Sequence, residues 1–385
     1  MQLSIEVDPK PKISPDLTIL VRRDDTNTNK FRFKYTLFSS RRDIDLHFRE
    51  CESPELGEKY LKLISKRFDL INASMKSRQS RDRLTTNLKN YGKKLYEALF
   101  NYEFDKIYWD SIYEKVRSVQ IISKESIPWE IIYPMRLGVK DNIPGKGFLT
   151  ELHNIAHWFP PHAPADTIEV DSLNMVRALS DDFAIREEDS IRALLPSHDT
   201  RCCQIEPCFD EVKSIFVSSS RAITHMICHG SVGKEDADQA ILRLNDIDLQ
   251  PDDIEACPNG QDTNHLIFLN GCETGSIGPG ISGLGGWAFN LVSRSCANVV
   301  LGPIWKVSGE SACEFAIAFY ESLYPKRSIS EEQQATQVSS SQSVLEAVRV
   351  ARKKAKGNDP TRLSYKIYGN PLVAVSKQAR SIERT

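Results

Sequence analysis

Short apolar runs bounded by turn residues alternate with longer amphipathic stretches in the second half of the chain. Residues 222–228 (AITHMIC) and 266–269 (LIFL) are rich in Ile, Leu, Phe and Met and too short for helices, so they predict buried strands. Residues 297–301 (ANVVL) predict another strand. Helices are predicted between and after these strands, the clearest having an apolar face of Ala312, Phe315, Phe319 and Leu323. Alternation of strand and helix from about residue 220 predicts a parallel sheet covered on both faces.

The first half of the chain has a different pattern. Residues 16–22 and 30–37 have strand-like preferences and flank a polar turn, which predicts a hairpin. A helix is predicted by apolar residues on one face, namely Leu84, Leu88, Tyr91, Leu95 and Leu99. Residues 115–123 predict a strand, whereas five prolines and three glycines within residues 134–165 predict a long irregular connection with a domain boundary.

The end of the chain is predicted to contain a polar insertion and one more helix–strand unit. Residues 326–343 are rich in Ser and Gln and lack an apolar period, so they predict a mobile insertion, with self-cleavage or docking as the alternative. A helix is predicted at residues 344–356, and a last strand at residues 372–375.

Composition narrows the class of protein. The 385 residues are 40% apolar and 26% charged, which is ordinary for a globular protein. The net charge of −2 argues against nucleic acid or an anionic membrane as a partner held by a global basic field. The chain opens without a charged-then-apolar signal segment, has no run of 18 apolar residues, and carries an odd number of cysteines, nine. We therefore expect a cytoplasmic protein.

Candidate chemistry lies where two of the predicted strands end. The first runs into His229 and Gly230, and the second runs into Asn270, Gly271 and Cys272. Adjacent parallel strands bring their carboxyl ends to one edge of a sheet, where α/β proteins build their sites. Imidazole beside thiol is a pair of base and nucleophile.

Several motifs carry a resemblance to a known family. Their order and spacing are similar to those of the CHAT peptidases, which are caspase-like cysteine proteases related to separase. The motifs are LYEAL at 95–99, IPWEII at 127–132, ICHG at 227–230, FLNGCETG at 268–275, GPIWKV at 302–307 and IYGNP at 367–371. The resemblance covers roughly residues 80–376.

The resemblance implies a fold, an activity and a site. The fold is α/β, a caspase-like and mostly parallel sheet flanked by helices on both faces, with an N-terminal β-hairpin and helical region. His229 and Cys272 are implied as the catalytic dyad of a cysteine endopeptidase, and the backbone N–H groups of Gly230 and Cys272 as its oxyanion hole. Residues 1–80 are expected to be accessory or regulatory, and residues 81–385 to form the peptidase domain, divided into a pseudo-half at 81–200 and a catalytic half at 201–385.

The chain differs from related families at two positions that bear on substrate preference. Metacaspases carry an Asp two residues before the nucleophile, where this chain has Asn270, and separase-like relatives carry an Asp where this chain has Gly309. Two acids that read a basic P1 side chain are therefore missing, and we expect a P1 preference that is not strongly basic. Glu273 and Glu310 are the acids that could replace them, and Trp305 is expected to form a pocket wall, with ordinary core as the alternative. The expected substrate-binding residues are therefore Asn270, Glu273, Trp305 and Glu310.

Two motifs suggest other ligands and are rejected. Residues 278–283 match G-x-G-x-x-G, but the preceding strand ends near Asn270 and the next strand ends without an acid, contrary to a dinucleotide site. The cluster Cys202, Cys203 and Cys208 lacks zinc-knuckle spacing and has no second pair. No metal and no cofactor are expected. The glycine-rich loop after Cys272 is expected to rearrange when substrate or activator binds.

Partners and pathway are implied by the resemblance alone. Family members act in bacterial antiviral defence and programmed cell death, where they cleave a dedicated protein such as a gasdermin-like pore former. A protein substrate and an activating partner protein are therefore expected. Two alternatives stay open: a catalytically silent scaffold that binds a partner protein, and hydrolysis or transfer on a non-peptide acyl substrate.

Overall fold

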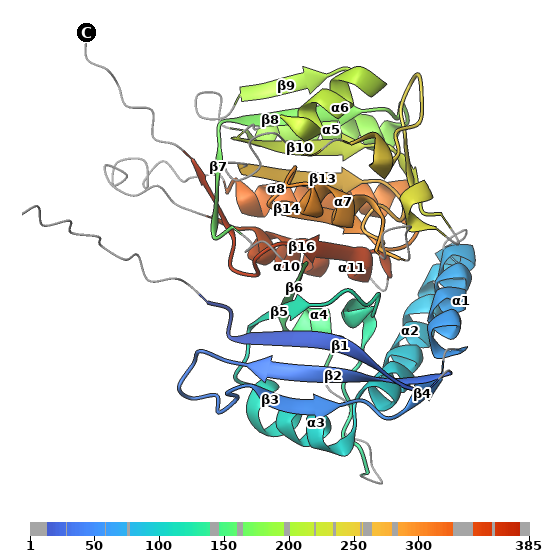
Figure 1. Ribbon diagram of the computed structural model, residues 1–385. Helices are drawn as coiled ribbons and strands as arrows, with labels where there is room; N and C mark the ends of the chain where they lie inside the picture. Colours follow the sequence, from blue (N-terminus) through green and yellow to red (C-terminus); the bar gives the residue numbers. More distant parts are fainter. Residues whose placement is uncertain are drawn as a thin grey trace, which may run out of the picture.

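A mixed sheet runs through the whole protein (Figure 1). The computed structural model describes residues 14–27, 29–57, 59–74, 78–138, 146–159, 165–195, 201–218, 221–233, 236–254, 256, 264–278, 284–325, 342–355 and 359–377. Within these residues, twelve strands form one sheet in the order β3-β2-β1-β5-β6-β16-β14-β13-β10-β8-β9, with β4 paired to β2. From β5 to β9 all neighbours are parallel except β14 and β16.

Six strands form the second part of the sheet, and they are β8 (Ser172–Arg177), β9 (Arg201–Ile205), β10 (Arg221–Ile227), β13 (Asn264–Asn270), β14 (Val299–Pro303) and β16 (Tyr365–Tyr368). All are largely buried except β9, which lies at the edge of the sheet and is partly exposed. One face packs against α5 (Asp182–Leu194), α8 (Gly309–Leu323) and α10 (Val344–Lys354). The other packs against α6 (Phe209–Val217) and α7 (Trp287–Ser293). This is the predicted sheet covered on both faces, and the predicted face of α8 is buried throughout.

Smaller elements complete the second part of the structure. They are β7 (Thr167–Val170), β11 (His229–Ser231), β12 (Ile241–Arg243), β15 (Gln342–Ser343), β17 (Ala374–Lys377) and α11 (Thr361–Ser364). Apart from β15, the polar insertion predicted at 326–343 lies outside the described residues. Residues 279–283 of the G-x-G-x-x-G segment also lie outside them, and Gly278 pairs with Gly285.

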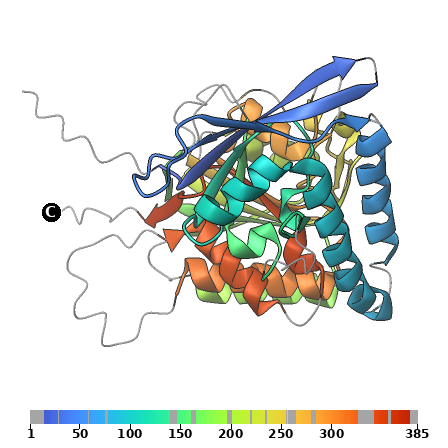
Figure 2. The same ribbon diagram turned by 90° about the horizontal axis from the view of Figure 1, so that it is seen from below.

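The predicted hairpin extends the central sheet. β1 (Leu17–Asn27) pairs antiparallel with β2 (Lys30–Phe38) and parallel with β5 (Ser118–Ile122). The remaining elements of this region are β3 (Arg49–Glu52), β4 (Leu56–Gly57), α1 (Lys59–Ser74), α2 (Arg78–Leu99) and α3 (Tyr102–Ile107). Figures 1 and 2 agree that α1 and α2 stand together at one end of the molecule. The domain division at residues 80 and 200 stays a prediction.

The prediction of an irregular connection at residues 134–165 was wrong. This stretch contains α4 (Leu149–Leu152) and β6 (Asn154–Trp158), which lies between β5 and β16 in the middle of the sheet. The strand has both faces covered, so it lacks polar alternation, and its buried His157 is a polar residue in the core. His157 Nε2 lies 2.7 Å from Glu130 Oε1 of the IPWEII motif, which gives that polar residue a buried partner.

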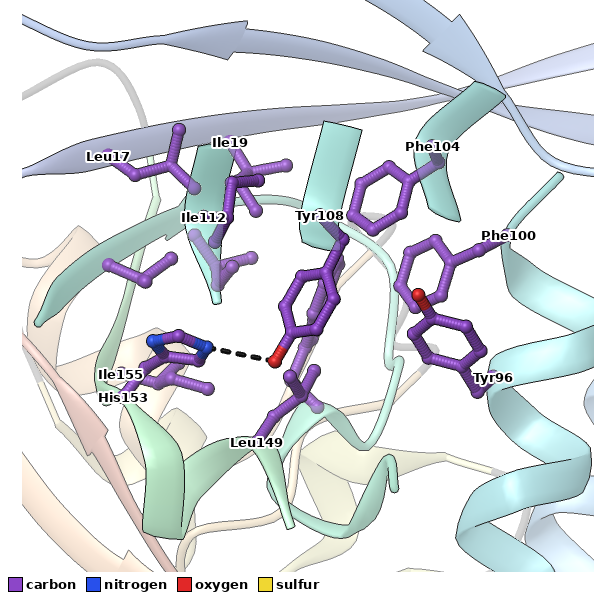
Figure 3. Close-up of a pocket in the computed structure, with 13 residues that line it drawn as sticks. Leu17, Ile19, Tyr96, Phe100, Phe104, Tyr108, Ile112, Leu149, His153 and Ile155 are labelled. Carbon is purple, nitrogen blue, oxygen red and sulfur yellow. Dashed lines mark hydrogen bonds between the residues drawn. The ribbon is translucent and has the colours of Figure 1, made fainter. Parts of the chain in front are cut away.

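A small cavity lies in the core of the N-terminal half (Figure 3). Its volume is about 20 Å³, enough for one water molecule. In this cavity Tyr108 Oη lies 3.0 Å from His153 Nε2, and His153 Nδ1 lies 2.9 Å from the carbonyl oxygen of Val116. The other lining residues are mainly apolar and come from elements before β7, so the cavity is separate from the ends of β10 and β13.

None of the described helices is long and apolar enough to cross a lipid bilayer.

Candidate active site

The register of two neighbouring strands aligns the predicted dyad. β10 and β13 are parallel, and Ile227 is paired with Asn270 at their carboxyl ends. His229 and Cys272 each follow two residues later. The two predicted catalytic residues therefore leave the same edge of the sheet at equivalent positions, as the apolar runs indicated.

Close packing joins the two strand ends. A methyl group at Gly230 would lie 2.5 Å from the carbonyl oxygen of Cys272 and 2.6 Å from Cγ2 of Thr274. Both distances are far shorter than a van der Waals contact, so only glycine lets these segments approach this closely. Gly230 and Cys272, the predicted oxyanion-hole residues, are thus brought together.

The two predicted catalytic side chains differ in environment. His229 begins the short strand β11, which pairs antiparallel with β12, and it is exposed. Cys272 is partly buried, and its Sγ lies 3.9 Å from the carbonyl oxygen of Val307, to which the thiol donates. Burial raises the pKa of the Cys272 thiol, and the carboxylate of Glu273 adds to this, whereas the nearby ammonium of Lys306 lowers it.

The turn that carries Cys272 is anchored by several bonds. Thr274 Oγ1 donates to the carbonyl oxygens of Leu269 and Gly271, at 2.8 and 2.9 Å. The N–H of Gly275 donates to the carbonyl of Pro303, and its own carbonyl accepts from Tyr368 Oη at 2.8 Å. Three of the motifs recognised in the sequence, FLNGCETG, GPIWKV and IYGNP, therefore meet around this turn.

Glu273 is the strained residue of the turn. Its φ of 61° lies in the left-handed region, which costs a residue with a side chain about 1–2 kcal/mol. Its Oε1 accepts a hydrogen bond of 2.7 Å from Nδ2 of Asn72, in the last turn of α1. The carboxylate predicted as a substrate-binding group is thus held by α1.

Asn72 is a site residue that the sequence analysis missed. Its Oδ1 accepts a 2.8 Å hydrogen bond from the N–H of Lys306, while its Nδ2 donates to Glu273. One amide therefore connects the turn after β13 to the loop whose Val307 carbonyl accepts from Cys272. A single Asn in a basic helix carries no sequence signal for such a role.

Asn270 belongs to a buried polar network beneath the turn. Its Nδ2 donates to Glu187 Oε1 at 2.6 Å, and its Oδ1 accepts from Tyr365 Oη at 2.6 Å. Glu187 Oε1 also lies 2.7 Å from Nε2 of His225, which is fully buried. The amide that was predicted to contact substrate is engaged by side chains of the core.

The other two predicted substrate-binding residues lie in different settings. Trp305 is fully buried in the apolar core that contains Leu363 and Trp129. Glu310 is exposed in the first turn of α8, next to the N-cap Ser308, where its charge stabilises the helix.

The other polar clusters offer no metal site in the described part of the chain. No group of three or more His, Cys, Asp or Glu residues could hold an ion there. Cys202 and Cys203 lie on the edge strand β9, and Cys208 precedes α6.

Comparison with known proteins decides the family. The sequence model of the CHAT domain matches residues 146–361, more than half of the chain. The chain belongs to the CHAT domain family. A search of curated proteins found no match.

Solved structures show what fold this CHAT protein has. A chain of the Saccharomyces cerevisiae separase–securin complex matches 94% of it with a TM-score of 0.55 and 10% sequence identity. The arginine-specific cysteine proteinase gingipain R matches 71% of this chain and 67% of its own, with a TM-score of 0.45 and 12% identity. The CHAT protein spans only 30% of the matched separase-complex chain. Its fold is that of the caspase-like cysteine peptidases, with a mostly parallel sheet between helices.

Proposed function

We propose that this protein is a cysteine endopeptidase in which Cys272 is the nucleophile and His229 the general base. The observation that carries the proposal is the shared register of β10 and β13, together with the contact between Gly230 and Cys272. Thiol, imidazole and two candidate oxyanion donors then stand on one edge of a caspase-like sheet. Family membership supports peptidase chemistry at this edge.

In the proposed reaction, Cys272 and His229 act first in forming a thioester and then in hydrolysing it. His229 takes the proton of Cys272, and the thiolate attacks the scissile carbonyl carbon to give a tetrahedral oxyanion. The N–H groups of Gly230 and Cys272 stabilise this oxyanion. Collapse breaks the C–N bond, and the amine leaves with the proton from the imidazolium of His229. Water, deprotonated by His229, then hydrolyses the thioester and restores the thiol.

The thiol must change its hydrogen bond before it reacts. In the structure its proton is directed to Val307, and burial raises the thiol pKa. One proton cannot be shared with Val307 and transferred to His229 at the same time. Turning the thiol toward the exposed imidazole therefore belongs to activation, and residues 1–80 are the proposed regulatory region, because α1 contacts both adjoining loops through Asn72.

The proposed substrate is a specific protein, with a P1 residue that is not strongly basic. Engagement of Asn270 with Glu187 and Tyr365 supports this preference, because the amide cannot also receive a basic side chain. The separase neighbour was crystallised with a protein, securin. The proposed biological role is in bacterial defence or regulated cell death, where the substrate would be a gasdermin-like pore former.

A second function, a silent scaffold that binds a protein partner, is favoured by one observation. The Cys272 thiol is partly buried, and this burial raises its pKa and favours the less reactive thiol form over the thiolate. A scaffold would keep this arrangement in every state.

Covalent labelling separates the two functions. A panel of peptide vinyl sulfones and chloromethylketones is expected to modify Cys272, as located by peptide mass spectrometry. Labelling should disappear in Cys272→Ala and fall strongly in His229→Ala, but persist in Cys203→Ser, which removes a partly exposed thiol elsewhere. Absence of Cys272 modification across the panel, with folded protein by circular dichroism, would favour the scaffold.

A further inference from the structure

A stripe of exposed residues runs the length of α1. Its members are Lys59, Leu63, Lys66, Leu70 and Ala73. Leu63 is 57% exposed and Leu70 is 56% exposed, and their separation of seven residues places them on the same face of the helix. The opposite face of α1 is buried in the core through Ile64 and Ile71. The stripe therefore is a second face of the helix that no part of the described chain covers.

The spacing of the stripe is that of a coiled-coil seam. Its members are separated by four, three, four and three residues, which is the spacing of a and d positions in a heptad. Leu63 and Leu70 occupy a positions, and the other three members occupy d positions. With a rise of about 1.5 Å per residue, the seam is roughly 21 Å long. A surface of this shape fits the apolar face of another helix.

The positive charge around the stripe indicates which kind of helix would bind to it. Residues 59–99, which contain α1 and α2, have eleven Lys or Arg and three Asp or Glu, a formal charge of +8 in a chain whose net charge is −2. A second copy of α1 would meet this charge with the same charge. An acidic helix would place carboxylates opposite Lys59 and Lys66, while its apolar residues cover Leu63 and Leu70. Nucleic acid would match the charge but leave both leucines in water.

The stripe ends beside the candidate active site. Asn72, between Leu70 and Ala73, bonds to Glu273 and to the N–H of Lys306, on the two loops that flank Cys272. In Figure 1, α1 stands at the end of the sheet toward which β10 and β13 run. The carboxyl end of the stripe therefore lies close to the two loops beside Cys272.

We propose that the stripe on α1 is a docking site for an acidic, amphipathic helical segment of the protein substrate. This inference rests on the proposed peptidase function, because it assigns the docked segment to the molecule that Cys272 cleaves. It adds a specificity determinant outside the candidate active site. Recognition then depends on a helix at a distance from the scissile bond, as well as on the residues beside it.

Peptide binding tests the surface without requiring catalysis. The probe is a fluorescein-labelled peptide of about three heptads with leucine at a, alanine at d and glutamate at e and g. Fluorescence anisotropy with full-length Cys272→Ala protein should show binding that weakens as salt rises. A matched peptide with lysine in place of every glutamate should bind at least tenfold more weakly. Equal binding of the two peptides, or no binding, would overturn the proposal.

Variants locate the binding. Lys66→Glu, and the double change Leu63→Ser with Leu70→Ser, should each weaken binding about tenfold or more, since each removes charge or apolar contact. The controls are Lys353→Glu on α10 and Ile247→Ser, which change an exposed lysine and a 62% exposed isoleucine elsewhere and should have no effect. Equal loss in the controls would overturn the assignment to α1. Dimerisation of the wild-type chain through these leucines would overturn it as well.

Covalent labelling of Cys272 tests whether the docked segment belongs to the substrate. Attaching the acidic peptide to a vinyl sulfone should accelerate Cys272 modification about tenfold over the lysine version, and Lys66→Glu should abolish the advantage. Acceleration by the unattached peptide would make the partner an activator and overturn the substrate assignment. Specific binding without modification of Cys272 by any warhead would instead contradict the proposed function and leave the docking surface standing.

Discussion

Nδ2 of Asn72 donates a 2.7 Å hydrogen bond to Oε1 of Glu273, the residue that follows the proposed nucleophile. The two residues are separated by 201 positions in the sequence. Because Asn72 also accepts from Lys306, a helix of the N-terminal region holds both loops beside Cys272. These two bonds connect α1 directly to the turn that carries the thiol.

Removing this amide is expected to slow the reaction of Cys272. Asn72→Ala loses two hydrogen bonds, each worth about 0.5–1.5 kcal/mol, and frees a turn that contains a residue at positive φ. We expect a roughly tenfold slower labelling by a peptide vinyl sulfone, with only a small fall in melting temperature. Asn87→Ala on the exposed face of α2 is the matched control. An unchanged labelling rate would show that the contact does not position the turn.

The pH dependence of Cys272 alkylation should report its neighbours. A raised pKa means that the thiolate forms at higher pH, so reaction with iodoacetamide should rise with pH to a midpoint above the ordinary cysteine range. Glu273→Gln removes a charge that raises this pKa and should move the midpoint down. Lys306→Ala removes a charge that lowers it and should move the midpoint up. Glu310→Gln is the control, and identical midpoints in all variants would contradict the assigned causes.

Much of the sheet, and the position of His229 and Cys272 at one edge of it, could be predicted from the sequence. Short, mainly apolar runs bounded by turn residues indicate strands buried on both faces, and parallel pairing then brings their ends to one edge. The N-terminal hairpin and the apolar face of α2 were predicted for the same reason, because burial in them follows a simple period. The resemblance to the CHAT peptidases was confirmed by the family match.

Contacts between polar residues far apart in sequence could not be predicted. β6 was missed because its buried His157 depends on Glu130, 27 residues earlier. The partners of Asn270 lie 83 and 95 residues away, so nothing near Asn270 indicated that its amide is engaged in the core. The local sequence pattern indicates which residues of a helix or strand are buried. It does not indicate the partners in these networks, because those depend on which elements the fold brings together.

A side chain at Gly230 is expected to disrupt the site. In Gly230→Ala the new methyl group would overlap the backbone of Cys272, and overpacking of this kind costs typically about 1–3 kcal/mol. We expect loss of Cys272 labelling and a lower melting temperature. Gly57→Ala provides the control, because its methyl group would meet nothing closer than 3.7 Å. Normal labelling of Gly230→Ala would mean that the two strand ends are not as close as described.

Replacing Asn270 by Asp tests whether this position belongs to the core network or reads substrate. The new carboxylate would stand 2.6 Å from Oε1 of Glu187, where Asn270 now donates, and burial beside a like charge would raise its pKa. An uncompensated buried charge costs on the order of 3–5 kcal/mol, so Asn270→Asp should melt well below the wild type at neutral pH. Because a carboxyl group with a raised folded-state pKa becomes neutral as pH falls through that pKa, the deficit should shrink on acidification. Asn245→Asp, at an exposed position, should change neither quantity. An Asn270→Asp protein of undiminished stability that gains cleavage after Arg or Lys would instead assign this position to the substrate pocket.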